Sequence, residues 1–398
     1  MSTVPPRALA GPAVLAAALG ALLIFGVAGI GRGSSPWQTD LDYFWVAGRL
    51  WAAGDNPYVP ETFTAEMQRV GRTIDRTALS YPPQFAPLAM LLGSLPLPAA
   101  RWLAVAIGLA SLGTLAWLAV RLVAGATGSP VADLAATRWL LPALVLGSPF
   151  AAHLLWIGQV TPLAIALLVG GWVEVRRGRE VWGGVLLGLA TFKPHLALLP
   201  LFWLLLERRA KALAVAAGVS AACAVPGLGL EHPLGVLGLW LRAVPTYQAD
   251  AANRLGGEFV VGIPSALAAV GVPMPPLWTL PLLGVLLTAG LWLFRRRLDE
   301  DDVLAWLVLV QCLGVWVHSN DLVMLVPVAA ALWRRLAVRQ ELWLPGAAGL
   351  AALYFPQRIV RAAGWLLLHH WRTLVVALAA LALARLARRD PPAQRADG

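Results

Sequence analysis

The sequence predicts an all-α polytopic membrane protein, a bundle of about twelve transmembrane helices with further helices in loops on the extracytoplasmic side. Hydrophobic residues make up 59% of the 398 residues and charged residues only 13%, so the chain is too apolar for an ordinary soluble domain. Many apolar runs approach the roughly 20 residues that a helix needs to cross a bilayer. The alternating apolar and polar pattern typical of half-buried strands is absent.

Apolar runs follow one another along the whole chain. The predicted crossing helices are 8–30, 99–123, 139–155, 160–175, 181–192, 194–206, 210–228, 276–295, 302–317, 322–335, 341–354 and 365–388. The first run resembles a signal peptide, but its length and the lack of a small-residue cleavage site favour an anchored helix. A further apolar stretch at 84–95 is short and bracketed by prolines, so it is predicted to remain on the outer side.

The runs 181–192 and 194–206 are both short for a crossing helix. They are predicted to form a hairpin whose tip, Lys193-Pro194-His195, lies below the outer surface of the membrane. Non-helical backbone is tolerated at such a depth where it lines a wet cavity. The tip therefore predicts a recessed polar site.

The positive charge of the chain is concentrated in the short loops between the apolar runs. The formal net charge is +10, and most Lys and Arg residues fall in loops that this arrangement places on one side. Cytoplasmic loops of membrane proteins carry such an excess, so both termini are predicted to be cytoplasmic. The charge thus indicates topology and argues against nucleic acid as a partner.

Two long segments, 31–98 and 229–275, are predicted to lie outside the cytoplasm. The first contains an amphipathic helical stretch at 41–53, which Gly54 and the following Asp-Asn-Pro turn end. The second contains a helical stretch at 233–247. Helices of this kind usually lie in the membrane interface with the apolar face toward lipid, so membrane lipids are predicted partners.

The chain shows no composition break that marks a separate soluble domain. It is therefore predicted to form one transmembrane domain, 1–390, followed by a cytoplasmic tail, 391–398. Cys223 and Cys312 both lie in apolar runs. Without metal-type spacing they are interpreted as small buried hydrophobic residues.

Polar residues that interrupt the apolar pattern gather on the outer face under this topology. They are Asp40, Tyr81, Gln159, Lys193, His195, His318 and Asp321. Polar residues with only structural roles are not expected to sort to one side, whereas a reaction chamber at a membrane surface is. Asp40 and the nearby Asp42 suit a general base, although an Asp that precedes a helix also commonly caps it.

Each of the other polar residues has both a structural and a functional interpretation. Lys193 and His195 need an anionic partner, which is either a structural carboxylate or a phosphate. Gln159 either binds a hydroxyl-rich ligand or caps a helix. His318, Asn320 and Asp321 form a polar corner rather than a metal site, because no third ligand is in register. Neither a metal nor another cofactor is predicted.

Five motifs, in order along the chain, resemble one family. These are DLDYFWVAGRLWAAGDNPY at 40–58, YPPQFAPLAMLLGSLP at 81–96, IGQVTPLAIALL at 157–168, GGVLLGLATFKPHLALLPLFWLL at 183–205 and HSNDLVMLVP at 318–327. Together they resemble the acidic-aromatic opening, the Tyr-Pro-Pro segment, the Gly-Gln helix, the Lys-Pro hairpin and the late polar corner of the bacterial membrane glycosyltransferases of family 87. The resemblance extends over about residues 10–340.

The resemblance implies a fold similar to that of the GT-C glycosyltransferases in a bacterial inner membrane. It implies an inverting transfer of a sugar, with mannose expected, from a polyprenyl-phosphate-linked donor to a lipid or glycan acceptor on the extracytoplasmic side. Asp40 is implied as the general base, with Asp42 the second candidate because Leu41 replaces the aromatic residue often found there. The charge that develops on the leaving phosphate needs cations, and Lys193 and His195 are expected to supply them, with an external Arg as another candidate.

The remaining residues of the implied site are expected to bind substrate. They are Asp42, Tyr43, Tyr81, Gln159, His318, Asn320 and Asp321. Two other functions stay open at this point. A secondary transporter also combines many helices with a few charges, although its site is expected near the midplane. A non-catalytic partner in the assembly of cell-envelope glycans is the other alternative.

Thiol labelling tests the prediction that the polar residues share one compartment. In a protein whose Cys223 and Cys312 are replaced by Ala, single cysteines at Asp55 and Pro194 should react in intact cells with a reagent that does not cross membranes. A cysteine at Arg208, a predicted cytoplasmic position, should react only after permeabilisation. Labelling of Asp55→Cys and Pro194→Cys from opposite sides would contradict the topology.

Overall fold

The computed structural model describes most of the chain. The described residues are 6–29, 37, 39–72, 79–125, 135–229, 232–249, 253–275, 279–336, 343–356, 359–360 and 370–389. The predicted tail at 391–398 lies outside them, as do the parts of the predicted loops and spans at 30–36, 250–252 and 365–369.

Helices account for nearly all the regular structure, as predicted. The α-helices are α1 (Pro6–Leu22), α2 (Thr39–Ala53), α3 (Pro60–Arg69), α4 (Ala86–Gly93), α5 (Leu97–Ala124), α6 (Ala135–Leu146), α7 (Pro149–Ile157), α8 (Thr161–Arg176), α9 (Glu180–Ala190), α10 (Pro194–Leu206), α11 (Ala210–Leu228), α12 (Pro233–Ala249), α13 (Ile263–Ala269), α14 (Leu280–Leu293), α15 (Val303–Gly314), α16 (Val326–Leu336), α17 (Trp343–Tyr354) and α19 (Trp371–Arg389). Shorter helical turns are η1 (Leu23–Val27), η2 (Pro83–Phe85), η5 (Arg295–Arg297), η6 (Glu300–Asp302) and η7 (Ser319–Leu325).

Among the described residues, one antiparallel strand pair accompanies the helices. β1 (Val260–Val261) pairs with β2 (Val317–His318), so that Val260 lies opposite His318. The pair joins the second long loop segment to the polar corner of the sequence. It therefore ties a loop to the residues predicted to form the site.

Each predicted crossing run contains one or more of these helices. By length and composition, α5 and α11 are the two described helices that can cross a membrane alone. The helices α6 and α7 form a third candidate if the pair, bent by 42°, crosses as one span. The prediction of about twelve crossings therefore remains a prediction beyond these two or three.

The bend between α6 and α7 divides the predicted span 139–155. Pro149 opens α7 and the Ser148 hydroxyl caps it by accepting a hydrogen bond from the Phe150 amide at 3.2 Å. Proline has no amide hydrogen to donate, and it suits the first turn of a new helix rather than the interior of a continuous one. The sequence Ser-Pro therefore turns one apolar run into two helices.

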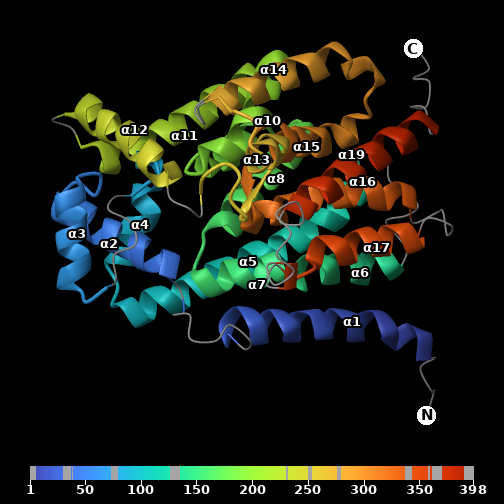
Figure 1. Cartoon of the computed structure of the whole chain (residues 1–398), viewed down its shortest axis with the longest axis horizontal. Helices are drawn as coiled ribbons and strands as arrows, with labels where there is room; N and C mark the ends of the chain where they lie inside the picture. The colour runs from blue at the N-terminus through green and yellow to red at the C-terminus, as the bar shows by residue number, and fades with distance from the viewer. Residues whose placement is uncertain are drawn as a thin grey trace.

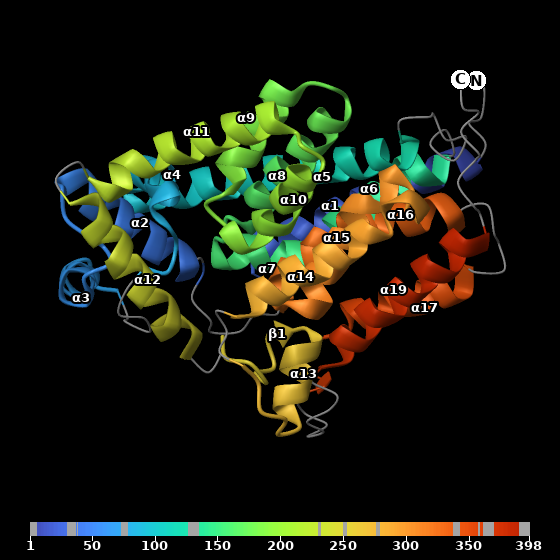
Figure 2. The ribbon, with the colours of Figure 1, turned by 90° about the horizontal axis from the view of Figure 1, so that it is seen from above.

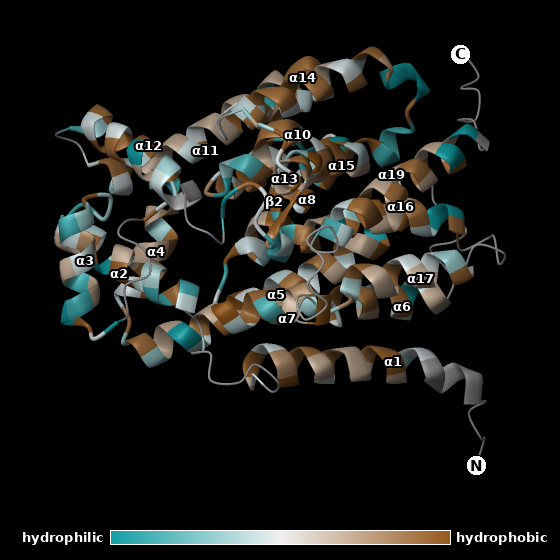
Figure 3. Ribbon diagram, in the orientation of Figure 1, coloured by the Kyte–Doolittle hydropathy of each residue, from teal (hydrophilic) through white to brown (hydrophobic). Residues whose placement is uncertain are grey.

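The long helices run side by side and the loop helices gather at one end (Figure 1). The start of α1 and the end of α19 lie toward the same side, whereas α2, α3, α4 and α12 cover the opposite end (Figure 1). In the view from above, β1 and α13 project below the bundle (Figure 2). Hydrophobic residues dominate the bundle helices, and hydrophilic residues collect at helix ends and around α3 (Figure 3).

The helix predicted at 41–53 forms as α2, but it does not lie on the surface as an amphipathic helix. Leu41, Phe44 and Val46 are all buried, although they point in different directions around the helix. The reason is that α2 is enclosed by α3 and α4 and donates from the Trp51 indole to the Gly227 carbonyl at the end of α11. The prediction of an interfacial helix was therefore wrong for this segment. Gly54, with φ +82°, ends the helix as predicted.

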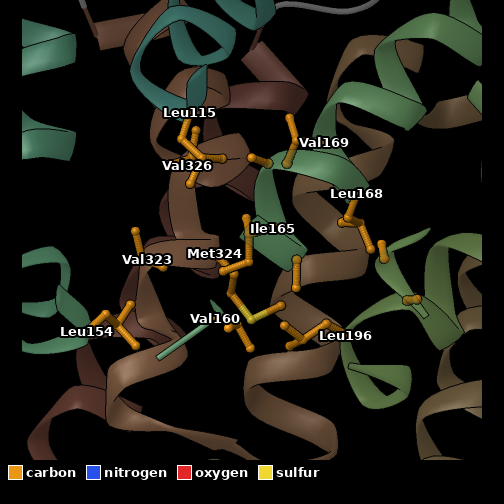
Figure 4. Packing of buried hydrophobic residues seen from close by; sticks show 14 of the residues in the cluster. Leu115, Leu154, Val160, Ile165, Leu168, Val169, Leu196, Val323, Met324 and Val326 are labelled. Atoms are coloured by element: carbon orange, nitrogen blue, oxygen red, sulfur yellow. The ribbon is translucent and has the colours of Figure 1, made fainter. Parts of the chain in front are cut away.

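The core lies where α8, α10, η7 and α16 meet. Val160, Ile165 and Val169 at and after the start of α8 face Met324 and Val326 in Figure 4, and all five are buried. Close packing of this kind leaves few voids and holds the attached backbone still. Gln159 and Thr161, described below, flank Val160 of this core in the chain.

The packing of α2 on α4 depends on a glycine. A Cβ at Gly48 would lie 1.8 Å from the Ala89 carbonyl oxygen, so Gly48→Ala must force the two helices apart. We expect a loss of about 1–3 kcal/mol or more in stability, seen as a lower Tm of the purified protein. Gly218→Ala is the control, because Gly218 has no atom within 4 Å of its would-be Cβ. An unchanged Tm in Gly48→Ala would show that α2 does not lie against α4.

Candidate functional site

Asp40 lies in the first turn of α2 and is buried. Its Oδ2 atom accepts a hydrogen bond of 2.7 Å from the side-chain amide of Gln159. The two residues are far apart in the chain and come together because α2 lies beside the junction of α7 and α8. This hydrogen bond from the Gln159 amide fixes the orientation of the Asp40 carboxylate.

Gln159 stands in the short turn between α7 and α8 rather than at a helix cap. Gly158 adopts a left-handed conformation with φ +73°, which ends α7, and glycine has no Cβ to oppose this. The interpretation of Gln159 as a helix cap is wrong, because Val160 is the N-cap residue of α8 and no side chain caps that helix. Gln159 is placed to bind other side chains.

Tyr81 orients the same amide from the other end. Its hydroxyl donates a hydrogen bond of 2.8 Å to Gln159 Oε1, which directs the Gln159 NH₂ group toward Asp40. The Tyr81 ring packs edge-on against Phe44 with centroids 4.8 Å apart, and its carbonyl accepts a hydrogen bond from the Tyr58 hydroxyl at 2.8 Å. Tyr81, Gln159 and Asp40 thus form a continuous chain of hydrogen bonds.

A second polar group surrounds the buried carboxylate of Asp321. Lys193 Nζ lies 3.1 Å from Asp321 Oδ1 and donates to Thr161 Oγ1 at 2.5 Å. The Thr161 hydroxyl in turn donates to Asp321 Oδ1 at 3.0 Å. Lys193 is the N-cap residue of α10, Thr161 begins α8 and Asp321 lies in η7. The sequence left two anionic partners open for Lys193, a structural carboxylate or a phosphate. The structure contains the carboxylate.

Two histidines lie near the Asp321 carboxylate. His195 Nε2 lies 3.8 Å from Asp321 Oδ2, and its ring stacks on that of Trp316 with a centroid distance of 5.8 Å and an interplanar angle of 6°. His318, on β2, meets the same Trp316 ring edge-on at 5.6 Å. Asn320 follows on η7 and is half-buried.

Thr161 connects the two polar groups, and sequence reasoning missed it. Its Oγ1 atom lies 3.4 Å from Gln159 Oε1 as well as within hydrogen-bond distance of Asp321. The signal was present, because Thr161 is a polar residue two positions after Gln159 in an apolar run. Trp316 was missed too, since tryptophan is common in membrane proteins for other reasons.

Asp42 and Tyr43 point away from these groups. Asp42 pairs with Arg101 at 3.2 Å and with Arg72 at 3.6 Å. Burial raises the pKa of the Asp42 carboxyl above its ordinary value, and the two guanidinium groups oppose that effect. Tyr43 stacks on Phe63 of α3 with ring centroids 6.1 Å apart. The structure therefore does not bring either residue to Gln159.

The site borders a small apolar recess. This recess has room for about one water molecule, and Gln159 is one of the residues that line it. Leu88, Leu92, Gly108 and Leu163 are among the others. Within the described part of the chain, no three His, Cys, Asp or Glu side chains group as ligands of one metal ion.

The comparison with protein families gives one match. The model of Glycosyltransferase family 87 matches residues 79–319, which is more than half of the chain. Tyr81, Gln159, Lys193, His195 and His318 lie within the matched part. Asp40 lies before the matched part, although the sequence motif at 40–58 also resembles this family. No curated protein and no solved structure matches the chain.

The Thr161 hydroxyl should contribute measurably to stability. Thr161→Val leaves a side chain of similar shape and removes the acceptor of Lys193 and the donor to Asp321, so we expect a loss of about 1–3 kcal/mol. Thr288→Val is the matched control, because Thr288 is equally buried and its Oγ1 has no hydrogen-bond partner among the described residues. Thermal unfolding should show a lower Tm than that of the wild type for Thr161→Val but not for Thr288→Val. Equal Tm values of the two variants would contradict the hydrogen-bond network.

Proposed function

We propose, from the premise that this chain belongs to glycosyltransferase family 87, that it moves a sugar from a polyprenyl-phosphate-linked donor to a lipid or glycan acceptor. Membership of the family implies transferase activity and a membrane setting. The finer parts are our proposal: mannose as the sugar, inversion at the anomeric carbon, a fold like that of the GT-C enzymes, and a site that faces the extracytoplasmic side.

The hydrogen bond between Gln159 and Asp40 is the observation that carries the proposal. A general base has to point toward the proton that it removes, and the bond of 2.7 Å holds the Asp40 carboxylate in one direction. A carboxylate offers about four acceptor positions, so this bond orients the group and leaves it able to accept a proton. Tyr81 supports the arrangement by holding Gln159.

The proposed reaction is a direct displacement at the anomeric carbon. An acceptor hydroxyl attacks that carbon while Asp40 takes its proton, and the bond between the carbon and the phosphate oxygen breaks. The products are the glycosylated acceptor and the polyprenyl phosphate. The transition state has oxocarbenium character, as in the hydrolysis of glycosides by inversion.

His195 is better placed than Lys193 to meet the leaving phosphate. The Lys193 side chain is 8% exposed and is already paired with Asp321, whereas the His195 side chain is 29% exposed. A cation that a buried carboxylate already neutralises adds little positive charge for a second anion. We therefore propose that Lys193 holds Asp321 and that His195, whose ring is stacked on Trp316, supports the departing phosphate.

Replacing the proposed base should nearly abolish transfer. In Asp40→Asn we expect a fall of about 10²- to 10⁴-fold in the rate of transfer from a radiolabelled polyprenyl-phosphate sugar, with the Tm close to that of the wild type. Asp42→Asn is the control, because Asp42 is held by Arg72 and Arg101, and its rate should fall by less than tenfold.

The reverse result, an active Asp40→Asn and an inactive Asp42→Asn, would move the role of base to Asp42. Absence of any transfer by the wild type, across polyprenyl-phosphate sugars and envelope glycolipid acceptors, would instead favour a non-catalytic partner in glycan assembly.

A further inference from the structure

Arg372 is a buried cation at the beginning of α19. Its relative exposure is 8%, and the neighbouring His370 and Thr373 are buried as well. The guanidinium carbon lies 5.1 Å from the centroid of the Phe150 ring and 4.6 Å from that of the Trp371 ring. The charged end of Arg372 is thus held among aromatic rings from α7 and α19.

No carboxylate meets this charge within the described residues. The one hydrogen bond from the Arg372 side chain is a long contact of 3.5 Å to the Phe355 carbonyl, and its Nε atom has no acceptor there. The nearby sequence is also poor in acids, because no Asp or Glu occurs between Glu341 and Asp390.

Two other arginines that are largely buried are paired with a carboxylate. Arg334 and Arg335 are buried to a similar degree, and both meet the buried carboxylate of Asp302, with Arg335 Nη2 at 2.5 Å from Asp302 Oδ2. A guanidinium carries five N–H donors, and a buried charge without a partner is strongly unfavourable. Contacts with aromatic rings stabilise a cation only modestly and do not replace a counter-ion.

We infer that Arg372 binds the phosphate group of an anionic lipid. Guanidinium suits this ligand because its fork of donors matches two phosphate oxygens. A lipid is favoured over free phosphate because Phe355, whose carbonyl accepts the contact from Arg372, exposes its apolar side chain, as does Ile359 four residues later. These side chains give acyl or prenyl chains an apolar surface near the charge. This inference does not rest on the proposed transferase chemistry.

A hydrogen bond and the strand pair connect the inferred lipid site to the candidate functional site. The Gly262 amide donates to the Thr373 hydroxyl at 3.1 Å, and Gly262 follows β1, which pairs with β2 and His318. The start of α19 and the segment with β1 and α13 lie beside each other in Figure 2. A lipid held at Arg372 would therefore stabilise the strand pair that carries His318.

Thermal unfolding in neutral detergent tests the inference. We expect phosphatidylglycerol or polyprenyl phosphate to raise the Tm of the wild type above its value with phosphatidylcholine. Arg372→Gln should weaken that binding by roughly ten- to a hundredfold, measured by titrating the lipid. Arg385→Gln, which removes an exposed arginine from the same helix, should bind like the wild type.

Each result decides the inference. Equal Tm values of the wild type with phosphatidylcholine and with both anionic lipids would overturn it, as would undiminished binding by Arg372→Gln. If inorganic phosphate alone produced the full shift, the lipid source would be wrong. If Arg372→Gln fails to fold, Arg372→Lys serves as the second variant, because it keeps the charge but lacks the fork of donors. Its lipid binding should be weaker than that of the wild type, and equal binding would overturn the inference.

Discussion

The buried ion pair between Lys193 and Asp321 is the interaction on which the arrangement of the site depends. It joins the start of α10 to η7, and Thr161 adds the start of α8 to the same point. Breaking one partner of a buried pair leaves an uncompensated charge, at a cost of about 3–5 kcal/mol. Three segments that are distant in the chain therefore have one stable relative placement.

One consequence concerns the two acids of α2. Asp40 and Asp42 are separated by about 200° around the helix, so a single orientation of α2 cannot present both to Gln159. The helix faces Gln159 with Asp40, and Arg72 and Arg101 occupy Asp42. Gly48 lets α2 approach α4 closely enough to hold that orientation. Packing of the loop helices, rather than any property of the acids themselves, distinguishes their roles.

The buried cations of this chain differ in the groups that surround them. Lys193, Arg334 and Arg335 have carboxylates close by, as the low-dielectric interior requires. Arg372 differs, because aromatic rings and a carbonyl surround it. A charge of this kind is expected to meet an anion that the protein itself does not carry. The contrast makes the beginning of α19 a site of lipid recognition and not part of the internal ion network.

The sequence by itself determined the helical class, the approximate bounds of the helices and the polar residues that interrupt them. Hydrophobic runs and Pro and Gly signals act locally, so they are readable from the chain. Only the tertiary structure decided the burial of α2, the pairing of Lys193 with Asp321, the central place of Thr161 and the separation of Asp42 from Asp40. These features depend on which distant segments pack together, and a local pattern of residues does not encode the rotation of one helix against another.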